Sequence, residues 1–226
     1  MFKKIVLMLL VVVAGFLIFA ATRPNTYRVQ RSKQIAAPPE IIFDQLDDFR
    51  SWGAWSPWEK MDGQMKKSFS GPEQGKDSSY AWEGNDKVGT GKMTITDIEP
   101  PKSLAYRLEF IKPFAAVATS DFKIEPASEG SSDVTWTMTG NNNFVSKVFG
   151  VFFDMDKAIG ADFERGLAEL ERVAEAEATK RSAAEKAAAE KVAAEAQAAA
   201  AAAEAQAQEA AAKAANVKSP PAARSR

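Results

Sequence analysis

Residues Ser103–Ile124 read SLAYRLEFIKPFAAVATSDFKI and contain two runs in which apolar and polar side chains alternate. The apolar positions of the first run are Leu104, Tyr106, Leu108 and Phe110. Alternation with a period of two is typical of a strand with one buried face. Lys112-Pro113 separates the two runs, because proline interrupts a strand. The stretch therefore predicts two antiparallel strands, Ser103–Ile111 and Ala116–Ile124.

Similar runs lie on both sides of this hairpin and are separated by turn residues. They predict further strands at Thr26–Ile35, Lys66–Ser70, Ser78–Asn85, Thr90–Ile98 and Asp133–Thr139. The alternation places the larger apolar side chains on one face, among them Tyr80, Trp82, Met93, Ile95, Phe122, Trp136 and Met138. A sheet with one polar and one apolar face needs a covering layer.

The covering layer is predicted from the C-terminal part of the sequence. From Asn143 onward the apolar residues recur at steps of three and four, which indicates one long amphipathic helix. A shorter helix is expected to begin at Pro38-Pro39-Glu40 and to end near Arg50. The fold class is thus α+β, with an antiparallel meander and a long C-terminal helix.

Composition excludes several classes of function. The formal net charge is −1 and the basic residues are scattered, so the chain lacks the basic surface of a nucleic-acid-binding protein. It contains no cysteine and no histidine, which removes thiol chemistry, the commonest general base and the commonest metal ligand. No cofactor, metal site or catalytic residue is predicted.

Residues 1–25 are predicted to be a transmembrane anchor. The uncharged run Ile5–Ala21 would extend about 25 Å as a helix, near the lower limit for crossing a bilayer. Lys3 and Lys4 also fit a cleaved signal peptide. The apolar run is long for a signal, however, and no A-x-A-like cleavage site follows it, so an uncleaved anchor is favoured.

The orientation of this anchor depends on two opposing features. Arg23, Arg28, Arg31 and Lys33 follow the apolar run closely and favour a cytoplasmic domain. The short basic tail before the run resembles an export signal and favours the opposite orientation. We expect a single-pass protein of the inner membrane whose folded domain is periplasmic.

Residues 175–216 are rich in alanine, glutamate and lysine and show no sustained apolar stripe. They predict a solvated helical spacer, with a coiled coil as the alternative, because alanine buries little area at core positions. Residues 217–226 are expected to be a disordered tail. The alanine-rich tail as a whole is the candidate contact for an envelope protein partner.

Several motifs of the central region resemble those of a known superfamily. They are Pro38-Pro39-Glu40, Trp52-x-x-Trp55-x-Pro57-Trp58, Tyr80-x-Trp82-x-Gly84 and Gly89-x-Gly91-x-Met93-x-Ile95. Together with the element order, they resemble the START and pollen-allergen (SRPBCC) superfamily, and within it the bacterial polyketide cyclase/dehydrase and lipid-transport group. The resemblance covers roughly residues 26–174.

This resemblance implies a helix-grip fold, in which a curved seven-stranded antiparallel sheet wraps around a long C-terminal helix and encloses an apolar cavity. Members bind lipids or other hydrophobic molecules, and a minority are enzymes without a shared catalytic residue set. Apolar-face and helix residues are the candidates for lining the cavity: Tyr80, Trp82, Met93, Tyr106, Trp136 and Phe163. Ordinary core packing is the competing interpretation.

Three further features have a functional and a structural interpretation. Trp52, Trp55 and Trp58 could form a cavity entrance, although packing at one end of the core is favoured. The carboxylates of Asp154, Asp156 and Asp162 suggest an exposed helix start more than a metal site. The glycine-rich residues 84–91 lack the context of a phosphate-binding loop and indicate a hairpin turn.

Three functions follow in order of preference. The first is membrane-anchored binding of a lipid or other small hydrophobic ligand. The second is a cyclase or dehydratase, which requires a carboxylate or tyrosine in the cavity; Glu83, Asp97 and Glu109 are candidates only if the strand faces are inverted. The third is an envelope scaffold that acts through the alanine-rich tail.

Overall fold

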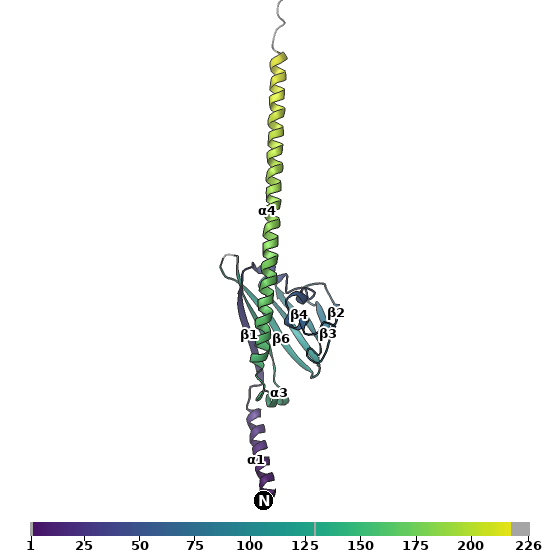
Figure 1. Cartoon of the computed structure of the whole chain (residues 1–226), viewed down its shortest axis with the longest axis vertical. Coiled ribbons are helices and arrows are strands. Elements are labelled where there is room, and N and C mark those ends of the chain that lie inside the picture. Colours follow the sequence, from purple (N-terminus) through teal and green to yellow (C-terminus); the bar gives the residue numbers. More distant parts are fainter. Residues whose placement is uncertain (1, 129, 218–226) are drawn as a thin grey trace, which may run out of the picture. The chain divides into compact units, whose positions relative to one another are not determined.

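The computed structural model describes residues 2–128 and 130–217. The chain divides into two compact units, one ending at Ala178 and one beginning at Thr179. The first unit contains an apolar helix, a seven-stranded antiparallel sheet and the covering helices (Figure 1). The strands are β1 (Thr26–Ile35), β2 (Lys66–Ser70), β3 (Ser79–Glu83), β4 (Thr90–Glu99), β5 (Ser103–Lys112), β6 (Ala116–Pro126) and β7 (Ser132–Asn141).

The helices are α1 (Phe2–Ala21), α2 (Pro39–Phe43), α3 (Phe144–Phe149) and α4 (Met155–Val217), with two 3-10 helices, η1 (Ser51–Ala54) and η2 (Pro57–Lys60). The strand order is β1-β7-β6-β5-β4-β3-β2, and every neighbouring pair is antiparallel. The predicted α+β class and seven-stranded sheet are therefore confirmed. Each strand lies where the alternation predicts it, with ends shifted by at most two residues.

The apolar face of the sheet is covered by the first part of α4. Phe163, Leu167, Leu170 and Ala174 recur on one side of this helix and are all buried. They join the inward side chains of the strands in one core, which includes Ile95, Leu104, Phe122, Val134 and Trp136. The helix thus supplies the layer that the one-sided apolar pattern of the sheet requires.

The prediction of one continuous helix from Asn143 is wrong. The Asn143 side chain accepts a hydrogen bond from the backbone N–H of Ser146 (2.8 Å) and starts α3, which ends at Phe149 with Gly150 as its C-cap. The Asp154 carboxylate then accepts the N–H of Lys157 (3.0 Å) in the first turn of α4. Two capping side chains therefore divide the region into separate helices, since each satisfies N–H groups that a helix start leaves open.

The short helix predicted to reach Arg50 ends at Phe43. It opens at Pro39 as expected, but tight three-residue turns follow, with N–H groups of Gln45 and Leu46 bonded to carbonyls of Ile42 and Phe43. Leu46 and Phe49 are nevertheless buried. The apolar spacing therefore identified core positions correctly, while the turns replaced the regular helix.

Asp47 lies in this turn region, and burial together with the neighbouring Asp44 and Asp48 raises its pKa to about 6. Between about pH 4 and pH 6 the folded protein therefore keeps a proton on Asp47 that the unfolded chain has already released. The free energy of unfolding falls as pH rises through this window. Asp47→Asn is expected to raise the free energy of unfolding at pH 7 by about 1 kcal/mol, because solvent screens this half-exposed group. Urea unfolding at pH 4 and pH 7 measures this change in the free energy of unfolding. An equal effect of the substitution at both pH values would contradict the raised pKa of Asp47.

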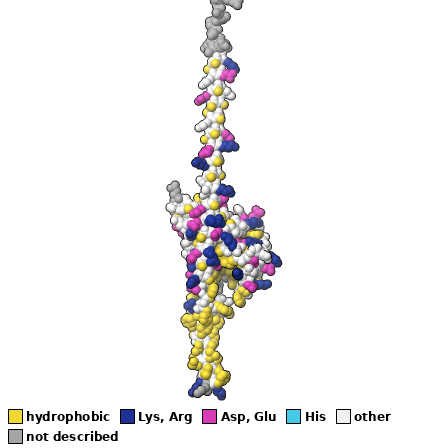
Figure 2. All heavy atoms as spheres, viewed as in Figure 1, with side chains coloured by type: hydrophobic (Ala, Val, Ile, Leu, Met, Phe, Trp, Pro, Cys, Tyr) yellow, Lys and Arg dark blue, Asp and Glu magenta, His cyan; other side chains and the backbone are white. Residues whose placement is uncertain are grey.

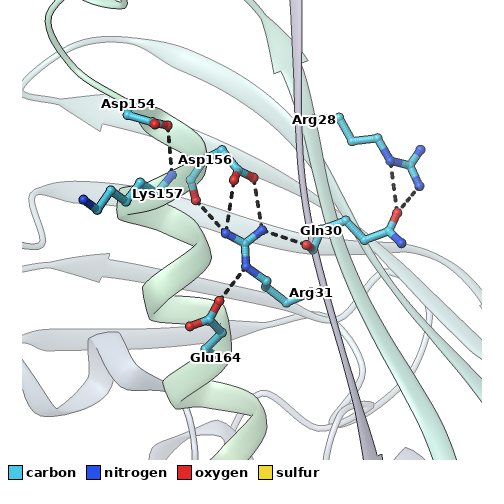
Figure 3. A network of polar contacts seen from close by, with 7 residues as sticks. All are labelled: Arg28, Gln30, Arg31, Asp154, Asp156, Lys157 and Glu164. Atoms are coloured by element: carbon cyan, nitrogen blue, oxygen red, sulfur yellow. Dashed lines mark hydrogen bonds and ion pairs between the residues drawn. The ribbon is translucent and has the colours of Figure 1, made fainter.

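Arg31 joins the first turns of α4 to strand β1 (Figure 3). Its guanidinium donates to the carboxylate of Asp156 (3.1 Å) and to Glu164 Oε1 (2.7 Å). The hydrogen bonds from Arg31 lower the pKa of Asp156 below its usual value. A Cβ added to Gly160 would collide with this guanidinium, so glycine at this helical position leaves room for the ion pairs.

Gly160→Ala is expected to leave stability nearly unchanged in the parent chain. Alanine favours the helix by about 1 kcal/mol, but its methyl group displaces Arg31 from its two carboxylates. In an Arg31→Ala background the same substitution should stabilise the protein by about 1 kcal/mol. A double-mutant cycle from thermal or urea unfolding checks this coupling, and equal effects in both backgrounds would contradict it.

The second unit begins at Thr179, and its described residues form the remainder of α4, up to Val217. Every side chain from Ser182 to Lys213 is exposed. Lys191 pairs with Glu195 (3.9 Å) and Lys213 with Glu209 (2.6 Å), at the i,i+4 spacing that stabilises isolated helices. The predicted spacer is thus helical over its described residues, and the predicted disordered tail lies outside them except for Val217.

Candidate functional site

The first unit contains a pocket of about 260 Å³ between the sheet, the 3-10 helices and α4. Strands β3, β4, β5 and β7 form its floor, η1 and η2 one side, and α4 the cover. Its lining residues are Trp52, Ser56, Trp58, Glu59, Met65, Tyr80, Trp82, Lys87, Val88, Met93, Tyr106, Leu108, Phe110, Met138, Ile159 and Phe163. This lining is mostly apolar, as in sites for small hydrophobic molecules.

The lining changes along the pocket from buried to exposed residues. At the inner end, Met93, Tyr106 and Met138 are buried. At the outer end, Trp82, Phe110 and Ile159 are partly exposed and Lys87 is exposed. The mouth therefore lies beside the turn that joins β3 to β4.

One polar cluster faces the pocket near η2. Tyr80 Oη donates to Glu59 Oε1 (2.6 Å), and Lys67 Nζ pairs with Glu59 Oε2. Burial, followed by the hydrogen bond and charge of Glu59, raises the pKa of Tyr80 well above its usual value. Tyr80 therefore remains a neutral hydroxyl near pH 7, and the charge of Glu59 is balanced by Lys67.

A second cluster of hydrogen-bonded residues lies at the inner end of the pocket, around Tyr106. Trp136 Nε1 donates to Ser120 Oγ (3.0 Å) and lies 3.2 Å from Tyr106 Oη, and Ser120 Oγ donates to the carbonyl of Thr137 (2.7 Å). Burial raises the pKa of Tyr106, so its phenol also stays protonated. Tyr80 and Tyr106 thus supply two neutral polar groups to a mostly apolar lining, which also contains Ser56, Glu59 and Lys87.

The structure brings five of the six cavity-lining candidates to this pocket: Tyr80, Trp82, Met93, Tyr106 and Phe163. Trp136 lies behind them, fully buried and stacked on Phe163 with ring centroids 4.0 Å apart. It supports the lining without forming part of it.

Of the three entrance candidates, Trp52 and Trp58 line the pocket and Trp55 does not. Trp52 and Trp55 are buried, and their indole N–H groups donate to the carbonyls of Leu46 and Gln45. These two tryptophans therefore pack in the core, which the sequence favoured, and only Trp58 is partly exposed.

Several lining residues were not identified from the sequence. Leu108, Phe110 and Met138 were placed on the apolar face, and their pattern could have added them to the candidates. Glu59 gave no such signal, because it lies in a 3-10 helix without periodicity. Its position depends on contacts with Tyr80 and Lys67 that are distant in sequence.

The acidic residues considered for other roles do not line the pocket. Glu83 and Asp97 are exposed, and Glu109 pairs with Arg107 (3.2 Å). Asp154 caps α4, Asp156 pairs with Arg31, and Asp162 pairs with Arg165. Within residues 2–128 and 130–217, no cluster of three or more acidic, histidine or cysteine side chains is placed to hold a metal ion.

Comparison with known proteins places this fold in a family. Residues 26–175, more than half of the chain, match the family model described as polyketide cyclase/dehydrase and lipid transport. The chain belongs to this family. The matched residues coincide with the sheet and the part of α4 that covers it, and they exclude α1 and most of the alanine-rich helix. Members of this family typically bind hydrophobic ligands.

Solved structures agree with the family's fold. The hypothetical protein jhp0584 of Helicobacter pylori has a TM-score of 0.52 at 10% identity, covering 66% of this chain and 88% of its own. A Thermobifida fusca protein solved by NMR has a TM-score of 0.50 at 17% identity, covering 65% of this chain and 92% of its own. At these identities the likeness shows the fold alone. No curated protein sequence matches the chain significantly.

Proposed function

We propose that this protein binds a lipid or another small hydrophobic molecule in the pocket between the sheet and α4, while α1 anchors it in a membrane. The observation that carries the proposal is the lining itself: most of the sixteen lining side chains are apolar, and Tyr80 and Tyr106, whose hydroxyls stay neutral, are among the few polar ones. Burial of an apolar ligand there would be favourable by about 25 cal/mol per Å².

The anchor is supported by the properties of α1. This helix has 20 residues and contains an 18-residue window with a mean hydropathy of 2.8, so it is long and apolar enough to cross a bilayer. Ala20 is its one buried residue among those described, so its side chains contribute almost nothing to the protein core. A signal sequence has the same properties, and the length of the apolar run favours the anchor. We place the folded domain in the periplasm, as the signal-like layout suggests.

Mass spectrometry of residues 26–226 tests the binding proposal. Removal of α1 leaves the core intact, because α1 contacts α3 and buries only Ala20. The protein is purified from cells without detergent and measured natively, before and after organic extraction. We expect a co-purifying apolar molecule that extraction removes. A ligand-free mass, together with no thermal stabilisation by a panel of fatty acids, phospholipids and isoprenoids, would contradict the proposal.

The enzyme alternative depends on Glu59. Among the described residues it is the one carboxylate that lines the pocket, and Tyr80 and Lys67 already occupy its two oxygens. A carboxylate held in this way is suited to positioning a ligand hydroxyl more than to accepting a proton.

The scaffold alternative depends on the exposed helix from Thr179. Deletion of residues 179–226 removes this helix and keeps the pocket, so it separates a scaffold role from ligand binding.

A further inference from the structure

An exposed aromatic surface lies at one end of the first unit. Phe144, Val145 and Phe149 of α3 and Phe152 and Phe153 after it are all exposed, with Phe152 80% exposed. Large apolar side chains gathered in this way indicate an interaction surface, since soluble surfaces rarely group so many. These residues did not become core because capping by Asn143 and Asp154 separates α3 from α4.

The same surface is in contact with α1. The rings of Phe16 and Phe152 lie 5.6 Å apart, and Lys147 Nζ donates to the carbonyl of Ala21 (3.2 Å) at the end of α1. Hydrophobic side chains continue from α1 onto the adjacent end of the domain in Figure 2. If α1 crosses a bilayer, α3 must lie at the level where the helix leaves the hydrocarbon.

The hairpin of β5 and β6 adds a second apolar element at this end of the sheet. Its tip carries Phe114, which is 78% exposed, between the exposed Ile111 and Val117. Antiparallel pairing places this tip at the same end as the start of β1, which follows α1, and the end of β7, which precedes α3. The end of α1, the α3 region and the β5–β6 tip are distant in sequence, and all three carry exposed apolar side chains at this end of the sheet.

The pocket mouth opens beside this tip. Lys87 and Val88 line the mouth, and the next residue, Gly89, lies so close to the Lys112 carbonyl and to Pro113 that a Cβ there would collide with that carbonyl. Phe114 follows directly. The exposed aromatic tip and the open end of the pocket are therefore neighbours.

Basic residues accompany the apolar ones. Arg23 and Lys147 line a groove of about 460 Å³ between the end of α1, the start of β1 and α3, together with Phe152 and Phe153. Asp154, which also lines it, caps α4. Exposed aromatic rings next to cations match the boundary between acyl chains and anionic headgroups, where both are stabilised.

We infer that α3, the residues after it and the β5–β6 tip form a bilayer-docking surface that holds the pocket mouth at the membrane interface. This inference rests on the proposed anchoring and ligand binding, and it adds the route: an apolar ligand enters from the bilayer without crossing water. The occupant of the surface is the headgroup and upper acyl region of a bilayer containing anionic lipid.

Site-specific quenching tests the docking surface in the full chain. The protein has no cysteine, so Phe114→Cys and Phe149→Cys each provide one labelling site at an exposed position. Lys102→Cys, in the turn between β4 and β5 at the opposite end of the sheet, is the matched control. Each variant carries an environment-sensitive fluorophore in vesicles of phosphatidylcholine and phosphatidylglycerol, some containing lipid spin-labelled near the headgroup.

We expect spin-labelled lipid to quench the labels at positions 114 and 149 severalfold more than the label at 102. Equal, weak quenching at all three positions in protein that floats with the vesicles would overturn the docking surface while leaving the anchor intact. If the labels quench one another and spin-labelled lipid does not quench them, the surface contacts a second copy of the protein. That result would also overturn docking on the bilayer. Protein that does not float with the vesicles would overturn both the membrane anchor and the docking surface. The ligand-binding proposal is tested independently, by mass spectrometry of residues 26–226.

Discussion

Trp136→Ala is expected to lower the free energy of unfolding by about 3–5 kcal/mol, the largest effect of any single substitution considered. Trp136 is fully buried, stacks on Phe163 and Phe122, and donates a hydrogen bond to Ser120. Alanine would remove these ring contacts and leave a cavity that the surrounding aromatic side chains cannot fill. Equilibrium urea unfolding of residues 26–226 measures the loss.

Two comparison variants identify the cause of this loss. Trp136→Phe keeps a stacked ring but leaves the buried Ser120 and Tyr106 without their indole partner, and should cost about 1–3 kcal/mol. Phe152→Ala removes an aromatic ring that is 80% exposed, and should change the stability of this soluble segment by less than about 0.5 kcal/mol. Equal losses for Trp136→Ala and Phe152→Ala would contradict the core described above.

Leu108→Trp is expected to weaken binding of an apolar ligand by about tenfold or more without lowering stability. Leu108 faces the pocket from β5, and the larger ring would occupy the space proposed for the ligand. The pocket has a volume of about 260 Å³, so the ring can extend into it and add buried apolar contacts. Titration with a fluorescent fatty acid, alongside urea unfolding, measures both quantities.

Thr119→Trp is the matched control for this substitution. It introduces the same side chain at an exposed position of the neighbouring strand β6, paired with Arg107. We expect unchanged ligand affinity. Similar weakening by both variants, or undiminished binding by Leu108→Trp, would place the ligand outside the pocket.

The sheet and its apolar face could be predicted from the sequence because each strand carries a local signal. A period of two identifies the inward side chains of β3 to β7 without any tertiary information. Of the large apolar side chains predicted to face inward, Ile95, Phe122 and Trp136 are fully buried, while Trp82 is partly exposed at the pocket mouth. The same signal explains why the four strand candidates Tyr80, Trp82, Met93 and Tyr106 lie in the pocket, and the helical spacing of α4 explains Phe163.

The helix boundaries could not be predicted as reliably, since short polar side chains decide them. Phe144 and Phe152 continue the helical spacing of α4, so periodicity alone assigns them to its buried stripe. Asn143 and Asp154 instead start two separate helices, and the phenylalanines are exposed. The proposed docking surface therefore arises at the point where the periodic pattern was misleading.

Polar contacts in the pocket were beyond prediction for a different reason. Glu59, Lys67 and Tyr80 come from η2, β2 and β3, and they meet because the sheet edge folds against η2. The Arg31 contacts with Asp156 and Glu164 likewise join residues more than 120 positions apart. Nothing in local spacing indicates such pairs, which follow only from the tertiary fold.

The methionine methyl groups offer the most direct test of an apolar ligand in this pocket. Met65, Met93 and Met138 line it, whereas Met155 lies outside it, at the start of α4, and lines the separate groove beside α3. Residues 26–226 with isotope-labelled methionine methyl groups are titrated with a long-chain fatty acid and followed by NMR. The account predicts saturable shifts of Met65, Met93 and Met138 while Met155 stays unchanged. No shift at these three methyl groups with any hydrophobic molecule tested, or a shift of Met155 in their place, would contradict it.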